Sequence, residues 1–310
     1  MIAKTLRWGR SILGYFLYTV AIIGIMLWVL FPADFLQQWI PEYFTARFPR
    51  TKVALAKVEI GFPGKLVLTG LEVSSSIESI DLLTVETLEL QPEFTALMNL
   101  QPVMNYMATV SEGRVIGTVS TDSSLSNFDV KGQLEQVKLD SISGIQEILE
   151  REIQGKVNAQ FKGKVQGDLT SLDELDVKVS IDNGGVGLKK DILGFAFFPF
   201  SQVTFTVTGN HQKLLVDSGQ MHSELFTADF TGQIEPRIPY TGSSVSFAGT
   251  MVPRTEFFAH VDDGELLSGI RSQLQDAGAA FKISGDIAHP GINFGELSSL
   301  FQAATNRMEP

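Results

Sequence analysis

The sequence predicts a mainly β protein, in which one N-terminal transmembrane helix precedes an elongated, curled antiparallel β-sheet with two or three short helices. Apolar and polar residues alternate over long stretches, as in "GKVNAQFKGKV" at 155–165, and this alternation is typical of a strand with one apolar face. Turn signals recur roughly every ten residues, whereas parallel strands need crossovers of about a dozen residues or more. From Ser11 to Ala33 there is no charged residue. These observations favour a meander, either groove-like or sandwich-like, behind a membrane anchor.

The composition narrows the class of protein further. The chain has 310 residues, of which 44% are hydrophobic, enough for a sizeable core. It has no cysteine, which excludes disulfides and thiolate metal sites. The formal net charge is −11, and the three basic residues among the first ten leave −11 − 3 = −14 for the remainder. An acidic body is a poor partner for nucleic acid or anionic lipid headgroups, so we expect no nucleic-acid partner.

Residues 1–33 are predicted to form a cytoplasmic stub and a transmembrane anchor. The stretch "ILGYFLYTVAIIGIMLWVLF" is about as long as the ~20 residues that cross a bilayer as a helix. The basic residues precede it, which predicts a cytoplasmic amino terminus with the bulk of the chain in the periplasm. A cleaved signal peptide is the alternative, but its apolar stretch is shorter and ends in a small-x-small site. The anchor is represented by Ile12, Leu13, Tyr15, Phe16, Leu17, Trp28 and Leu30.

Residues 34–50 are predicted to form a juxtamembrane amphipathic helix or linker. Phe35, Leu36, Trp39 and Tyr43 recur at helical spacing. They predict a short helix on the outer membrane–water interface, kinked or ended near Pro41. The alternative is a continuation of the anchor that packs on the following domain.

Residues 51–310 are predicted to form one periplasmic β-domain. Its first strands form a hairpin at Pro63-Gly64, and a third strand ends at Pro92. One or two helical turns follow at 93–102, then two strands joined at Glu112-Gly113 and a strand over 127–140. At 141–155 the pattern changes to a helical stripe of Ile145, Ile148, Leu149 and Ile153 that ends at Gly155.

The second half repeats the strand pattern. Strands are expected at 155–165, 172–189, 201–209, 225–236 and 244–250, with one last strand over 279–294. The stretch "DNGGVG" at 182–187 is interpreted as a hairpin turn, and "GFAFFPF" at 194–200 as a possible loop or edge that meets the membrane or a partner. A helix is predicted over 262–278 and a weaker one over 296–305.

No motif indicates catalysis, a metal or a cofactor. The four histidines, His211, His222, His260 and His289, are scattered. The acidic residues in "VDDGELL" are better explained as the first turn of a helix than as a metal site. Neither a phosphate loop nor a G-x-S-x-G motif is present. We therefore expect a protein that is not an enzyme.

Large aromatic residues on the apolar strand faces are the most informative feature. They are interleaved with glycines, which allow a sheet to bend sharply and leave room above it. Two interpretations remain open: a packed core with each glycine opposite a ring, or an accessible apolar groove. The groove candidates are Phe161, Phe205, Phe226, Phe230, Phe247 and Phe281.

The order of these features resembles the type II secretion system protein N family. The resemblance rests on "FPAD" after the anchor, the hairpin "VEIGFPGKLVLTGLEVS", the segment "LLTVETLELQPEFTALMNL" and the closing "FKISGDIAHPGINF". The chain is also similar, more distantly, to AsmA-like envelope proteins. The first resemblance implies an inner-membrane protein, accessory to type II secretion, that acts through contacts with other secretion subunits. The second implies a greasy curled sheet, and so the alternative of a lipid-binding or lipid-transfer module that holds phospholipid acyl chains.

Overall fold

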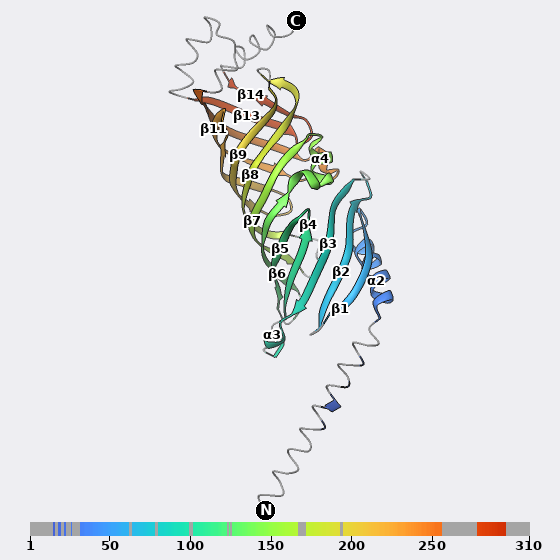
Figure 1. Cartoon of the computed structure of the whole chain (residues 1–310). Helices are drawn as coiled ribbons and strands as arrows, with labels where there is room; N and C mark the ends of the chain where they lie inside the picture. Colours follow the sequence, from blue (N-terminus) through green and yellow to red (C-terminus); the bar gives the residue numbers. More distant parts are fainter. Residues whose placement is uncertain are drawn as a thin grey trace, which may run out of the picture.

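The protein is built on a single antiparallel sheet. Over the residues that it describes, a computed structural model shows 14 strands, each hydrogen-bonded to the next strand along the chain. In Figure 1 the strands follow one another from β1, at the end where the chain enters the sheet, to β14 near the C-terminus. The first and last strands do not pair, so the sheet is open. The prediction of a mainly β antiparallel meander is confirmed, and no second sheet is present in the described part of the chain.

The described part of the chain covers most of the predicted β-domain. The structure describes residues 15, 18, 19, 22, 26, 32–61, 64–77, 80–98, 102–122, 124, 126–166, 172–192, 195–255 and 278–295. The predicted helices over 262–278 and 296–305, with His260 and the acidic residues beside it, lie outside these residues apart from Gly278.

The strands differ widely in length. The first seven are β1 (Thr51–Gly61), β2 (Lys65–Ser75), β3 (Asp81–Pro92), β4 (Val103–Val110), β5 (Gly113–Thr121), β6 (Asn127–Lys138) and β7 (Ile153–Gln166). The others are β8 (Leu172–Ile192), β9 (Phe195–Gly209), β10 (Leu214–His222), β11 (Phe226–Glu235), β12 (Ser244–Pro253), β13 (Ala279–Asp286) and β14 (Pro290–Asn293). The hairpins predicted near Pro63-Gly64 and Glu112-Gly113 are confirmed as the β1–β2 and β4–β5 connections.

In the described part of the chain, three α-helices accompany the sheet: α2 (Ala33–Arg47), α3 (Phe94–Met98) and α4 (Ser143–Leu149). Helix α2 lies beside β1 (Figure 1), with Leu36 and Ile40 packed against the buried cluster of Leu55, Val58 and Leu68. Of the two expectations for Pro41, a kink or a helix end, the helix end is wrong, since α2 continues to Arg47. The predicted helical stripe over 141–155 is confirmed only to residue 149.

That early end of α4 has a local cause. Glu150, the C-cap residue of α4, adopts a left-handed conformation with φ 48°. The chain then turns into β7, so Ile153 and Gly155 belong to a strand and not to the helix.

The register connects the apolar strand faces into one continuous surface. Residues that lie opposite each other in neighbouring strands share a face of the sheet. One row runs from Phe205 in β9 through Gly219, Phe230 and Gly249 to Phe281 in β13. The ribbon at 155–165, now β7, therefore contributes one band to a face shared by neighbouring strands. We call this apolar surface the inner face.

Three other local predictions are corrected. The segment "DNGGVG" is not a hairpin turn but part of β8, where Gly184 and Gly185 pair with Phe200 and Pro199. The Phe197 ring can lie on this backbone because Gly185 has no side chain. A Cβ on Gly185 would stand 2.2 Å from the ring. The segment "GFAFFPF" is mostly part of β9.

The closing segment is also divided. The residues expected to form one last strand form two, β13 and β14, which pair as a hairpin through a turn at 287–289.

Helix α4 joins distant parts of the sheet. Ser143 Oγ donates a hydrogen bond to the Asp81 carbonyl at the start of β3, over 3.1 Å. At the other end of the helix, His289 Nε2 lies 3.3 Å from Glu150 Oε2. Because His289 immediately precedes β14, the last edge of the sheet curls back to α4. Figure 1 shows α4 between β3 and the C-terminal strands. The C-terminal part of the sheet is thus curled. We call the place where the residue before its last strand meets the end of α4, at Glu150 and His289, the seam.

Candidate functional site

The curled C-terminal part of the sheet encloses an apolar cavity on its inner face. The cavity has a volume of ≈ 350 Å³, near the lower end of the roughly 300–1,000 Å³ typical of small-molecule sites. It is lined by Arg151, Val186, Leu188, Phe198, Phe200, Met221, Phe226, Ala228, Phe230, Phe247, Met251, Phe281, Ile283, Pro290, Ile292 and Phe294. Of the lining residues that the structure describes, every one except Arg151 is apolar.

Glycines set the position of the rings in the cavity wall. A Cβ on Gly219 would stand 2.2 Å from the Phe230 ring, and one on Gly232 would stand 2.3 Å from the Phe247 ring. A Cβ on Gly249 would stand 2.2 Å from the Asp229 carbonyl oxygen and 2.8 Å from the Phe281 ring. The rings therefore lie directly over backbone that carries no side chain. This arrangement combines the two interpretations of the aromatic pattern, since each ring is packed on a glycine while the rings together leave a space.

Two further rings enter the cavity because the alternation of β9 breaks. Val203 and Phe200 are both buried although they are three residues apart. On the paired strand β8, Asn183 takes a positive φ of 50° between the pairs on either side of the break. Phe198 and Phe200 consequently line the cavity, and Phe198 meets Phe226 edge-to-face, with ring centroids 5.8 Å apart.

A buried serine holds this part of the wall in place. The Ser223 side chain is 2% exposed, and its Oγ donates to the Pro199 carbonyl over 2.6 Å. The same Oγ accepts a hydrogen bond from the Leu225 backbone N–H at 3.2 Å. These bonds connect the β10–β11 turn to the start of β9, beside Phe198 and Phe200.

Four of the six predicted groove residues meet in the cavity: Phe226, Phe230, Phe247 and Phe281. Phe161 lies elsewhere, over Gly132, and shares that glycine with Tyr106. Burial raises the pKa of Tyr106, whose hydroxyl donates to the Lys131 carbonyl over 3.2 Å. Phe205 is half-buried and lines not this cavity but the larger concavity described next. The pattern of alternation identified the correct face but not which part of it forms the apolar cavity.

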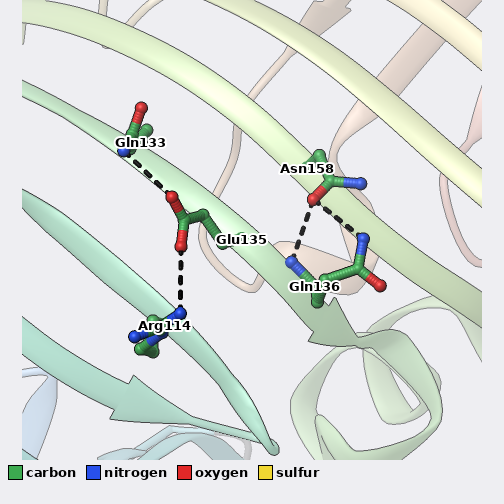
Figure 2. Close-up of polar contacts among 5 residues, drawn as sticks. All are labelled: Arg114, Gln133, Glu135, Gln136 and Asn158. Atoms are coloured by element: carbon green, nitrogen blue, oxygen red, sulfur yellow. Dashed lines mark hydrogen bonds and ion pairs between the residues drawn. The ribbon is translucent and has the colours of Figure 1, made fainter.

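A second, larger concavity of ≈ 700 Å³ lies over β6–β10 and is lined largely by polar side chains. Figure 2 shows two of its contacts: Gln133 donates to Glu135 over 3.0 Å, and Asn158 Oδ1 accepts from the Gln136 backbone N–H at 3.0 Å. Glu135 is also 3.6 Å from Arg114. These contacts connect β6 to its two neighbours, β5 and β7.

The smaller cavity is the better candidate for a ligand site. Several polar side chains around the larger concavity are already bonded to one another, and Gln133, Gln160 and Gln220 are exposed to water. Covering apolar surface with an apolar ligand lowers the free energy, and the free energy gained grows with the area removed from water. Among the described residues, no group of three His, Asp or Glu side chains could hold a metal.

The predicted membrane anchor falls mostly outside the described residues. Of its representative residues only Tyr15 is described, as a helical residue with an exposed side chain. Ile12, Leu13, Phe16, Leu17, Trp28 and Leu30 are not described. Within the described residues, no helix combines the length and the hydrophobicity that crossing a membrane requires.

These features define a class: a single-sheet antiparallel meander whose curled end surrounds an apolar cavity. Comparison of the chain with protein-family models, curated proteins and solved structures finds no match.

Proposed function

We propose that this protein is a non-enzymatic, inner-membrane-anchored periplasmic protein that binds acyl chains in the cavity of its curled sheet. The observation that carries the proposal is the cavity wall, in which apolar side chains from several strands surround ≈ 350 Å³ with one charged residue among them. Binding there requires no catalytic side chain. Each methylene moved from water into such an environment contributes about 0.8 kcal/mol.

The position of α2 supports a site close to a bilayer. Leu36 and Ile40 pack on the sheet, whereas Phe35, Trp39 and Tyr43 are 61%, 45% and 45% exposed. Trp39 and Tyr43 stack with ring centroids 5.1 Å apart. Aromatic residues of this kind favour the membrane–water interface. We propose that α2 lies at the periplasmic surface of the membrane, after an anchor formed by residues 1–33.

Filling the cavity tests the proposal. Ala228 is 7% exposed and lines the cavity, and Ala108 is equally buried on β4 in a packed core cluster. Ala228→Leu should reduce acyl lipid that copurifies with the full chain several-fold, because the new side chain occupies ligand space. Ala108→Leu imposes a comparable overpacking cost, about 1–3 kcal/mol, and should leave the bound lipid unchanged. Equal lipid content in the wild type and both variants would argue against the cavity as the site.

A second proposal is an accessory role in type II protein secretion through contacts with other secretion subunits. It is supported by the family resemblance and by the open sheet, since unpaired edge strands can pair with a partner chain. Deletion of the gene should then block export of specific proteins while envelope lipids stay normal. Normal protein export in the deletion strain would contradict a role in secretion and would leave the lipid-binding proposal unaffected.

A further inference from the structure

The described part of the cavity wall contains one charged side chain, that of Arg151, and its Nε has no hydrogen-bond partner among the described residues. Arg151 Nε is buried and makes no hydrogen bond within the described part of the chain. The other lining residues offer it no polar side chain. A buried donor without a partner costs about 1–3 kcal/mol, and more when it is charged. Such a group in a native structure calls for an explanation, and an acceptor oxygen from water or from a ligand would supply one.

The neighbouring acids are directed to other residues. Glu150 Oε2 lies 3.3 Å from His289, and Glu152 Oε1 accepts from Gln154 Nε2 at 2.6 Å. The bond that Arg151 does make uses its backbone N–H, which donates to the Gln146 carbonyl over 3.2 Å. Among the described lining residues, its guanidinium is the one cationic group, and the others are apolar.

The fold places Arg151 at the seam of the curl. The left-handed Glu150 ends α4 and sets Arg151 just before β7, while Pro290 and Ile292 of β14 line the same cavity. The adjacent pair of Glu150 and His289 is solvent-exposed, with side-chain exposures of 45% and 67%. Arg151 thus follows directly after an exposed residue and lines the same cavity as Phe230 and Phe247. A ligand at this position would meet a cation at one end and hydrocarbon along the rest.

We propose that the cavity binds a single-chain anionic amphiphile, with the headgroup oxygens on the Arg151 guanidinium and the chain among the phenylalanine rings. The planar guanidinium donates in pairs to carboxylate or phosphate, so both headgroups share the required chemistry. If a methylene takes up about the ~30 Å³ of a liquid water molecule, the cavity of ≈ 350 Å³ holds roughly a dozen carbon atoms. That volume suits one chain and not two side by side. The inference rests on the proposed acyl-chain binding and adds the charge and chain number of the ligand.

The test compares three probes that differ only in the headgroup: dodecanoate, dodecyl phosphate and dodecanol, each with the same terminal diazirine. The full chain in zwitterionic lipid nanodiscs is photolysed with each probe, and adducts on β11–β13 peptides are quantified by mass spectrometry. At least one anionic probe should label these peptides about tenfold more than dodecanol. Which anionic probe labels more strongly distinguishes a fatty acid from a phosphate-bearing lipid.

Variants at Arg151 complete the test. Arg151→Met should lower anionic labelling about tenfold, to the dodecanol level, and Arg151→Lys should retain part of the preference. Arg114→Met, at an exposed position near the polar concavity, should change nothing.

The possible failures are distinct. Equal labelling of the wild-type protein by all three probes would overturn the proposal that the ligand is anionic and would leave acyl-chain binding intact. This comparison uses the wild-type protein alone, so it does not depend on the folding of a variant. Absence of cavity adducts with every probe would overturn both. Preference for an anionic probe that persists in a folded Arg151→Met protein would remove Arg151 from the assignment.

Discussion

At the scale of single residues, the cavity depends on pairs of glycine and phenylalanine. Gly219, Gly232 and Gly249 lie on three successive strands, and each lies beneath a ring of the next strand. The rings of Phe230, Phe247 and Phe281 are half-buried and lie against the backbone of the sheet. A side chain at any of these glycines would push its ring toward the space that we assign to the ligand.

Gly219→Ala tests this arrangement. All three atoms nearest to the new Cβ belong to the Phe230 ring, at 2.2–2.5 Å, so we expect a loss of about 1–3 kcal/mol in the free energy of unfolding. Combining it with Phe230→Leu should cost less than the sum of the two single changes, because the smaller side chain relieves the contact. Denaturant unfolding measures all three. Gly242→Ala is the control, since nothing lies within 4 Å of its new Cβ; additive costs would contradict the pairing.

At the scale of elements, α2 has two faces with different roles. Leu36 and Ile40 attach it to the sheet, and its aromatic residues face away. Pro41 lies within the helix without ending it. The sequence pattern predicts the helix. It does not predict which face of the helix packs on the sheet, because that depends on the tertiary contact between α2 and β1.

The two faces predict different outcomes for neighbouring substitutions. Leu36→Ala should cost about 1–2 kcal/mol and speed hydrogen exchange in α2, because it removes packing against β1. Phe35→Ala, at a position 61% exposed, should change the free energy of unfolding by less than about 0.5 kcal/mol. Matching effects of the two substitutions would mean that α2 is not docked as described.

The β5–β6 turn contains a carboxylate with a shifted titration. The Ser126 backbone N–H donates to Asp122 at 3.0 Å, and the Ser124 and Ser126 hydroxyls donate at 2.8 Å each. These hydrogen bonds hold the pKa of Asp122 well below its usual range. Because the folded pKa is lowered, the contribution to stability is present above the unfolded pKa and is lost as pH falls through the folded pKa.

Titration followed by NMR should therefore find Asp122 still ionised at pH values where an ordinary aspartate takes up a proton. Ser126→Ala removes one hydroxyl donor and should raise the Asp122 midpoint, while retaining the backbone bond. A midpoint at the usual aspartate value in the wild type would show that the turn is not formed in solution.

At the scale of the whole molecule, the sequence allowed prediction of the antiparallel meander and of its apolar face. It did not locate the hollow part of that face, because the curl depends on contacts far apart in the chain, such as His289 with Glu150. The sequence predicts a turn at "DNGGVG" and the structure has a strand there, because a glycine-rich strand beneath aromatic rings has the same composition as a turn. Arg151 gave no sequence signal, since one arginine after a helix is ordinary until an apolar cavity surrounds it.

The measurement that tests the central claim most directly is photo-crosslinking in cells at two adjacent positions of β12. Phe247 lines the cavity, whereas Ala248 is exposed on the opposite face. A photoreactive phenylalanine analogue at 247 should give an adduct carrying an acyl chain, and the same analogue at 248 should not. No lipid adduct at 247 in a folded, membrane-inserted protein, or equal adducts at both positions, would contradict acyl-chain binding inside the curled sheet.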